Sequence, residues 1–367
     1  MTSILSILLA GCHGVGPDDG TGTGNPSNGG LSDLEGPITL YADRDIIMAD
    51  DSYTATLTVL LLDDHGVEHD VTSDVEIYLE GEDKPVGSRE FKTSKAGEYS
   101  FYAVRGFDIS NTVTVTAAGG VPEFPTDTDT GNLSFRHHMM LLQHTGNECP
   151  NCPRLMEILK QLAGDEDYSS RYYHVASHSY NTSDAAYSSA AASLSKTPGV
   201  RYYPWLTFNL STDNGYLIEE IKEGIDRLAK DVADAGISAA AARSGDNVYV
   251  NVNVKAGKEA KYRVTAWLLE DNIHSVQSGA TASWQNMHEN CLRAMAGTSK
   301  TENIYGKNIG SLAEGECHDL ILSLDLESGW KTDNCKVMVI VTSGVDEFEL
   351  VNCAVFPVGG SVSYEYK

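Results

Sequence analysis

The chain has 367 residues, with 52 Asp and Glu against 26 Lys and Arg, so its formal net charge is −26. Nucleic acid is itself a polyanion, so this charge argues against nucleic acid as a partner. Hydrophobic residues at 41% and 34 glycines are typical of a folded protein with loops. The length allows two or three domains, and no run of about 18 apolar residues beyond the N-terminus predicts a membrane-spanning helix.

The first twelve residues have the pattern of a bacterial lipoprotein signal. The apolar run MTSILSILLA ends in Leu9-Ala10-Gly11-Cys12, where small residues precede a cysteine. Such a cysteine becomes the lipidated N-terminus after cleavage, so we expect Cys12 to anchor the chain in membrane lipid. No Lys or Arg precedes the apolar run, which leaves open whether Met1 is the natural start. Lipidation implies an oxidising compartment, where disulfides form.

Three segments follow the predicted signal. Residues 13–35 are rich in Gly, Asp, Ser and Thr, which predicts a flexible linker. Residues 36–118 contain short runs of alternating polar and apolar residues separated by turns, a pattern typical of a small antiparallel sandwich. Within them, residues 97–103 and 113–115 resemble the last two strands of a bacterial immunoglobulin-like module, which implies a spacer or adhesive unit. Residues 119–134, with prolines and a Thr-Asp repeat, predict a second linker.

Residues 135–236 change character, because predicted strands alternate with predicted helices. An apolar strand at residues 139–142 precedes a helix whose apolar residues fall on one face. Further strands are expected at 172–175 and 205–210, and further helices at 183–196 and 218–232. This alternation predicts an α/β domain. From 237 to 367 the period-two pattern returns and predicts a second β-rich domain, most simply a sandwich.

The motif that carries chemistry is Cys149-Pro150-Asn151-Cys152-Pro153, between an apolar strand and an amphipathic helix. The positive end of the helix dipole favours the thiolate of Cys149, which would attack a substrate disulfide while Cys152 resolves the mixed disulfide. Glu148 opposes thiolate formation. Three interpretations stay open: a redox pair, a structural disulfide, and half of a metal site. The last is disfavoured because zinc needs four ligands and no second CxxC follows.

Two further patterns resemble known families. Tyr203-Pro204 precedes a strand about 50 residues after the cysteines. It resembles the cis-proline loop of the thioredoxin superfamily, which implies that Pro204 orients a substrate strand. Residues 141–153 resemble the hallmark segment of the Omp28-related outer-membrane lipoproteins of Bacteroidetes, and residues 267–293 resemble that family's C-terminal β domain. The resemblance implies a thioredoxin-like domain over 135–236 and an outer-membrane lipoprotein that is periplasmic or surface-exposed.

Four more cysteines lie in the C-terminal segment and are predicted to form structural disulfides: Cys291, Cys317, Cys335 and Cys353. Cys335 and Cys353 flank a predicted hairpin with its turn near Gly344, so we expect them to pair. Cys291 and Cys317 would then close the long polar insert between them. Each such bridge would contribute a few kcal/mol.

Two functions remain open on the sequence. The leading hypothesis is thiol-disulfide exchange with protein thiols or disulfides as partners and with neither a cofactor nor a metal. The alternative is a non-catalytic surface binding or assembly protein that keeps the thioredoxin-like fold as a scaffold. Exposure of the Cys149 sulfur favours the first, whereas burial of Cys149 beneath the C-terminal segment favours the second.

Overall fold

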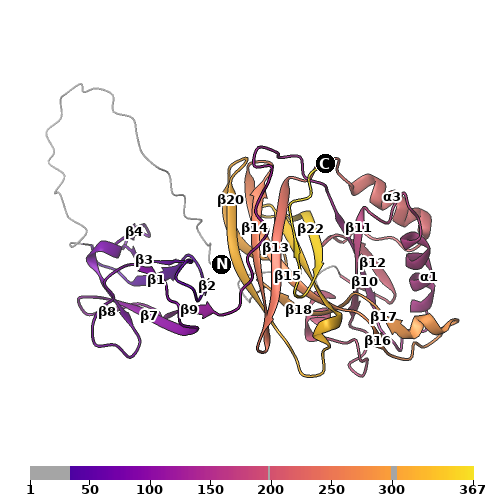
Figure 1. Cartoon of the computed structure of the whole chain (residues 1–367), viewed down its shortest axis with the longest axis horizontal. Helices are drawn as coiled ribbons and strands as arrows, with labels where there is room; N and C mark the ends of the chain where they lie inside the picture. The colour runs from indigo at the N-terminus through magenta and orange to yellow at the C-terminus, as the bar shows by residue number, and fades with distance from the viewer. Residues whose placement is uncertain (1–33, 197–198, 299–303) are drawn as a thin grey trace. The chain divides into compact units, whose positions relative to one another are not determined.

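The structure is a computed structural model that describes residues 34–196, 199–298 and 304–367. The chain divides into two compact units, Met1–Ala118 and Gly119–Lys367. The fold is mostly β, and one of its sheets mixes parallel with antiparallel strands and is flanked by helices (Figure 1). Cys12, the predicted lipid anchor, lies outside the described residues.

The described part of the first unit consists of short strands in two sheets. One sheet has the order β1-β3-β4, with β6 beside β3, and the other has the order β2-β9-β7-β5, with β8 beside β7. β2 and β9 are parallel, and the other pairs are antiparallel. The elements are β1 (Ile38–Ala42), β2 (Ile46–Met48), β3 (Ala55–Leu62), β4 (Glu68–Asp70), η2 (Thr72–Asp74), β5 (Glu76–Leu79), β6 (Glu90–Phe91), β7 (Gly97–Arg105), β8 (Asp108–Ile109) and β9 (Val113–Ala118).

Alternating residues form the core of this unit. In β3, Leu57, Val59 and Leu61 are buried while the residues between them are partly exposed. Phe101 and Ala103 of β7 belong to the same apolar cluster but come from the other sheet. The period-two pattern therefore gives each sheet one apolar face, and the two faces share one core.

The second unit contains the described α-helices and the longest described strands. The helices are α1 (Cys152–Ala163), α2 (Ser189–Leu194) and α3 (Ile218–Leu228), with 3-10 turns η3 (Ser283–Asn286) and η4 (Thr332–Asn334). The strands are β10 (Met139–Thr145), β11 (Tyr172–His178), β12 (Trp205–Phe208), β13 (Ala235–Ser244), β14 (Asn247–Ala256), β15 (Ala260–Glu270), β16 (Ile273–His274), β17 (Met287–His288), β18 (Cys291–Ala296), β19 (Lys307–Leu312), β20 (Cys317–Asp325), β21 (Cys335–Ser343), β22 (Glu349–Pro357) and β23 (Ser361–Val362).

The largest sheet joins two segments that we expected to form separate domains. Its strand order is β12-β10-β11-β18-β15-β21-β22, with β19 beside β15. β10 and β11 are parallel, and β11 continues the sheet to β18 through the parallel pair Ala176 and Cys291. β18 thus covers an edge of β11 that would otherwise expose unpaired backbone groups. Residues 135–236 and 237–367 consequently lie in one compact unit.

Helices cover both faces of the β12-β10-β11 part of this sheet. Leu155 and Leu159 of α1 and Ile221 of α3 pack with the apolar side chains of one face. Leu194 of α2 packs in the cluster on the opposite face, together with Met140 of β10. The alternation of strands and helices predicted from the sequence is confirmed here, because each helix buries its apolar side against the sheet.

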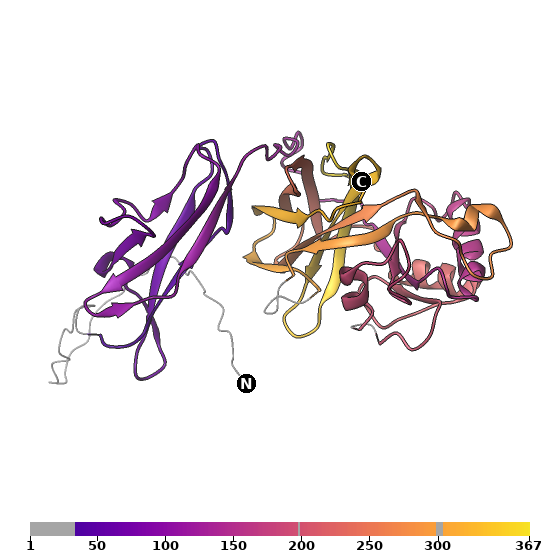
Figure 2. The ribbon, with the colours of Figure 1, turned by 90° about the horizontal axis from the view of Figure 1, so that it is seen from below.

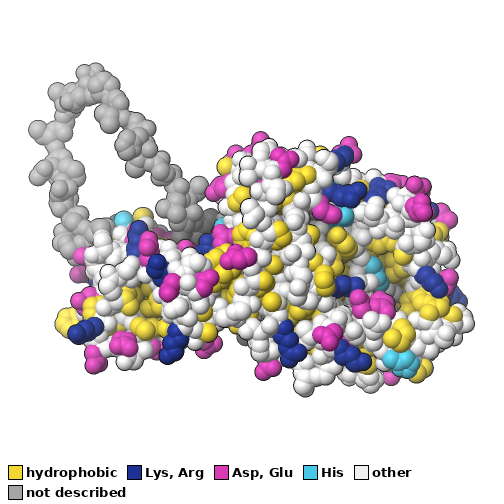
Figure 3. All heavy atoms as spheres, in the orientation of Figure 1, with side chains coloured by type: hydrophobic (Ala, Val, Ile, Leu, Met, Phe, Trp, Pro, Cys, Tyr) yellow, Lys and Arg dark blue, Asp and Glu magenta, His cyan; other side chains and the backbone are white. Residues whose placement is uncertain are grey.

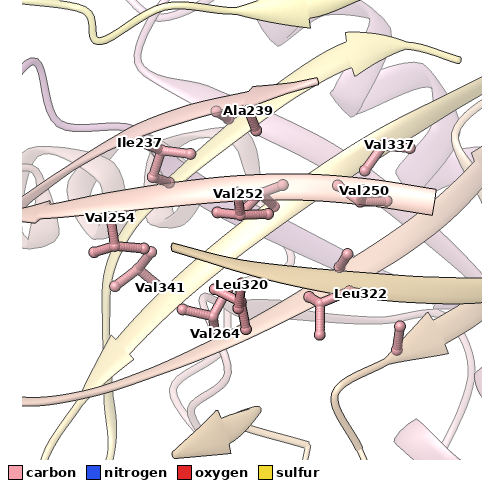
Figure 4. Close-up of a cluster of buried hydrophobic side chains, with 14 of the residues drawn as sticks. Ile237, Ala239, Val250, Val252, Val254, Val264, Leu320, Leu322, Val337 and Val341 are labelled. Atoms are coloured by element: carbon pink, nitrogen blue, oxygen red, sulfur yellow. The ribbon is translucent and has the colours of Figure 1, made fainter. Parts of the chain in front are cut away.

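A second sheet, with the order β20-β14-β13-β23, faces β15 and β21 of the first. Figure 4 shows how their side chains meet: Val250 and Val252 of β14 lie among Val264 of β15 and Val337 and Val341 of β21. These residues are fully buried. This core supports the part of the large sheet that carries β18.

The surface mixes charges of both signs. On the face drawn in Figure 3, acidic side chains are spread over both units with basic side chains between them. None of the helices in the described part of the chain is long and apolar enough to cross a membrane.

Candidate functional site

Cys149 and Cys152 form a disulfide at the junction of β10 and α1, with their Cα atoms 5.4 Å apart. The N–H of Cys149 donates to the carbonyl of Gly146 (3.1 Å), and the N–H of Cys152 donates to the carbonyl of Cys149 (3.3 Å). Pro153 lies in the first turn of α1, where its missing N–H costs no helical hydrogen bond. The predicted CxxC pair at a helix start is confirmed.

A segment from far along the chain covers this disulfide. Residues 273–288, called the cap segment below, run from β16 through η3 to β17, and the two strands pair with each other. Figures 1 and 2 show this orange segment beside α1. Cys149 is 1% exposed and Cys152 is 0% exposed. The sulfur predicted to be an accessible nucleophile is therefore buried.

The side-chain amide of Gln277 joins the cap segment to the loop that contains the cysteines. Its Nε2 lies 3.3, 3.1 and 2.9 Å from the carbonyl oxygens of Gly146, Asn147 and Cys149 respectively. Gln277 is itself only 3% exposed. An NH2 group has two hydrogens, so about two of these hydrogen bonds can be fully formed at one time.

Other hydrogen bonds connect the same two segments. The N–H of Ser278 donates to the carbonyl of Asn147 (2.6 Å), and the Asn147 side chain donates to Oγ of Ser275 (2.8 Å). Nε2 of Gln285 donates to the carbonyl of Pro153 (3.2 Å). The cap segment therefore contacts the loop before the disulfide and the first turn of the helix after it.

Gly279 brings the cap backbone directly against the cysteine loop. A Cβ atom at this position would stand 2.4 Å from the carbonyl oxygen of Pro150, which is too close for any side chain. Its φ of +72° also lies in the left-handed region that favours glycine. Close backbone contact over the CxxC residues thus depends on glycine here.

A buried hydrogen-bonded pair supports the loop from the other side. Nδ1 of His178 lies 2.7 Å from Oδ2 of Asp184, and both side chains are almost fully buried. Asp184 also accepts hydrogen bonds from the N–H groups of Asn147 (2.8 Å) and Ala186 (3.0 Å). Burial alone would raise the pKa of Asp184, but the hydrogen bonds from His178 and these N–H groups lower it to about 2. Asp184 is consequently ionised and fixes the start of the cysteine loop.

Pro204 lies at the same end of the sheet as the disulfide. The Tyr203–Pro204 peptide bond is cis. β12 is antiparallel to β10, with Trp205 opposite His144, so Pro204 comes next to the end of β10. The hydroxyl of Tyr203 is 2.9 Å from Oγ of Ser179. The role of Pro204 in orienting a substrate stays a prediction.

The four C-terminal cysteines differ from our expectation, because Cys291, Cys317, Cys335 and Cys353 are all free. In the β21–β22 pair, Cys353 lies opposite Ile340, five residues from Cys335. Five residues of strand span about 17 Å, well beyond the reach of a disulfide. The predicted Cys335–Cys353 pairing is therefore wrong, and the Cys291–Cys317 pairing is likewise not formed.

Sequence analysis missed a cavity of about 520 Å³ bounded by β10, β11, α1 and the cap segment. Burial lowers the pKa of His174 and of His288 to about 4, so both rings are neutral at pH 7. A signal was present: the polar residues Gln143 and Thr145 of β10, and His174 and His178 of β11, are two and four positions apart, which places each pair on one face of its strand. The lining residues are Gln143, Thr145, Met156, Leu159, Lys160, Ala163, Ser169, Tyr172, His174, Ala176, His178, Trp284, Met287, His288, Glu289 and Asn290.

Potential metal ligands gather elsewhere. Among the residues that the structure describes, the group of three ligand-type side chains close enough to share an ion is Asp63, Asp64 and His65, in the first unit. Asp64 and His65 are more than 80% exposed. Asp63 already accepts hydrogen bonds from His69 and from backbone N–H groups of its own turn. This arrangement is that of an exposed acidic turn.

Comparison with solved structures finds similarity to HBP35 of Porphyromonas gingivalis, with 17% identity and a TM-score of 0.49 over 64% of this chain and 78% of that one. A structure of the surface layer protein SbsC, domains 4–9, is similar at 12% identity and a TM-score of 0.19, over 90% of this chain and 51% of that one. No protein-family model matches this sequence, and no curated protein does.

Proposed function

We propose that this chain is a non-catalytic binding protein that uses a thioredoxin-like fold as its scaffold. In this proposal residues 135–236 are the thioredoxin-like part, and the Cys149–Cys152 disulfide is a structural crosslink between β10 and α1. The observation that carries the proposal is the burial of both sulfurs beneath the cap segment.

The chemistry of exchange explains why burial matters. An attacking thiolate must reach one sulfur of a disulfide and displace the other, so the rate depends on access. Neither cysteine offers more than 1% of its surface. Hydrogen bonds from Gln277, Ser278 and Gln285 oppose movement of the covering segment. A disulfide protected in this way stabilises the fold and does not exchange with a substrate.

The N-terminal part supplies the proposed location. We propose that Cys12 carries lipid that anchors the chain in the outer membrane, facing the periplasm or the cell surface. The immunoglobulin-like residues 36–118 would act as a spacer between the anchor and the binding unit. The lipoprotein pattern of residues 1–12 supports this location.

Thiol-disulfide exchange is the second candidate, favoured by a CxxC disulfide at a helix start with Pro204 at the same end of the sheet. In the reduced protein, the Cys149 thiolate would attack a substrate disulfide and release one substrate thiol. Cys152 would then attack Cys149, release the second substrate thiol and re-form the disulfide. An external thiol reductant would have to restore the dithiol, and the cap segment would have to open first.

Insulin reduction by dithiothreitol separates the two candidates. The assay uses the full chain with Cys12→Ser, so that the anchor cysteine does not react, and compares it with the Cys149→Ser variant. We expect both proteins to leave the uncatalysed rate unchanged. Turnover by the first protein that disappears in Cys149→Ser would reject the scaffold proposal and favour the redox enzyme.

A further inference from the structure

The cavity beside the disulfide combines a polar floor with largely apolar walls. β10 and β11 form the floor, α1 forms one wall, and η3, β17 and the residues after them form another. Its volume of about 520 Å³ lies within the range of sites that hold small molecules.

Three polar atoms at the floor lack a hydrogen-bond partner within residues 34–196, 199–298 and 304–367. They are Nε2 of Gln143, Oγ1 of Thr145 and Nε2 of His178. The three residues are 2%, 3% and 1% exposed. An unpaired buried polar group loses its hydration without compensation, so nearly all such groups in folded proteins are paired. The floor is thus suited to receive polar atoms from a ligand.

Two of these atoms, Nε2 of Gln143 and Nε2 of His178, have opposite roles in hydrogen bonding. The ionised carboxylate of Asp184 accepts a hydrogen bond from Nδ1 of His178 (2.7 Å), and we assign His178 the tautomer in which Nε2 is an acceptor. Oε1 of Gln143 accepts from Nε2 of His174 (3.0 Å), so the unpaired atom of Gln143 is its amide donor. The floor therefore offers one donor and one acceptor.

The spacing of these atoms favours an amide over a hydroxyl. Gln143 lies opposite Ala176, and Thr145 lies opposite His178 in the neighbouring strand. The donor and the acceptor therefore come from positions two residues apart along the strands, about 7 Å between backbone positions. An amide carries its acceptor and its donor on separate atoms. A carboxylate has no donor for His178, and an ammonium group has no acceptor for Gln143.

The walls suit an uncharged and preferably aromatic body. Met156 and Met287 line the cavity together with Trp284, and thioether sulfurs contact aromatic rings favourably. The ammonium group of Lys160 lies 4.1 Å from the ring centroid of Trp284. Burial lowers the pKa of His174 and of His288 to about 4, so these two rings bring no positive charge to the cavity at pH 7.

We infer that this cavity binds an uncharged molecule with an apolar, aromatic body and an amide group, whose carbonyl accepts from Gln143 and whose N–H donates to His178. The inference rests on the proposed binding function and adds the chemical class of the ligand. Thr145 would contribute its hydroxyl to the same amide.

Three probes of similar shape test the inference by isothermal titration calorimetry on the full chain with Cys12→Ser. 2-Naphthamide carries both the acceptor and the donor, 2-acetylnaphthalene lacks the N–H, and 2-naphthoate is charged. We expect 2-naphthamide to bind about tenfold or more tightly than either analogue, because a buried partner left unpaired costs about that factor. Equal affinity for the three probes, or no binding of 2-naphthamide, would overturn the inference.

Two variants assign the binding to the cavity. Gln143→Met and Thr145→Val remove floor groups with little change of volume, and each should weaken 2-naphthamide binding several-fold. Gln161→Met, on the exposed face of α1 and outside the cavity, should leave it unchanged. Binding that is insensitive to both floor variants would contradict the inference. If the chain catalyses insulin reduction and still binds 2-naphthamide, only the proposal of a non-catalytic scaffold is rejected. If it neither reduces insulin nor binds 2-naphthamide, only the inferred ligand class is rejected.

Discussion

Removing the Gln277 amide should expose the disulfide to small thiols. In the native chain, Nε2 of Gln277 contacts three carbonyl oxygens of the cysteine loop, of which about two are fully bonded at once. Each hydrogen bond contributes about 0.5–1.5 kcal/mol net, so Gln277→Ala should lower the free energy of cap opening by about 1–3 kcal/mol. The population of the open form, and with it the reduction rate, should rise about 5- to 150-fold.

The assay follows reduction by excess dithiothreitol, with acid quenching and mass spectrometry of the peptide that contains Cys149 and Cys152. Val276→Ala is the matched control, because Val276 lies in the same cap segment but is 72% exposed. We expect the control to react at the wild-type rate. A Gln277→Ala variant that reacts no faster than the control would refute the assignment of the cap segment as the cover of the disulfide.

Three other changes test the same geometry. Gly279→Ala places a methyl group against the cysteine loop, so reduction by dithiothreitol should again become faster than in Val276→Ala; an unchanged rate would contradict the close contact. Replacing Cys149 and Cys152 by serine opens a very short loop, which should lower the free energy of unfolding by about 2 kcal/mol in urea titrations. An unaltered midpoint would mean that the crosslink is not structural. Burial lowers the pKa of His144 and of His174 to about 4. The unfolded state takes up protons below about pH 6.5, so the free energy of unfolding should fall as the pH decreases from 6.5 to 4, by up to about 1.4 kcal/mol per pH unit for each histidine. A flat profile would argue against buried neutral rings.

Local signals were enough to predict the elements around the cysteines. The apolar run before Cys149 forms β10, and the apolar residues after Cys152, at spacings of three and four, form the buried face of α1. The alternation of polar and apolar residues likewise predicted strands in the first unit. These features depend on neighbours in the chain, so periodicity and turn residues reveal them.

The features that decide the function depend on distant residues. Gln277 contacts the loop at Cys149 across 128 positions of sequence, and no local pattern marks it as part of a cover. The free state of Cys353 follows from the register of β21 and β22, in which it faces Ile340. At the start of α3, the carboxylate of Glu220 accepts a hydrogen bond from the N–H of Leu217.

The reduction rate of the Cys149–Cys152 disulfide in the folded chain, compared with the same chain in denaturant, tests the central claim most directly. A cover held by several hydrogen bonds predicts that dithiothreitol reduces the folded form at least about a hundredfold more slowly. Equal rates in the two states would contradict it and would mean that the sulfurs are open to attack.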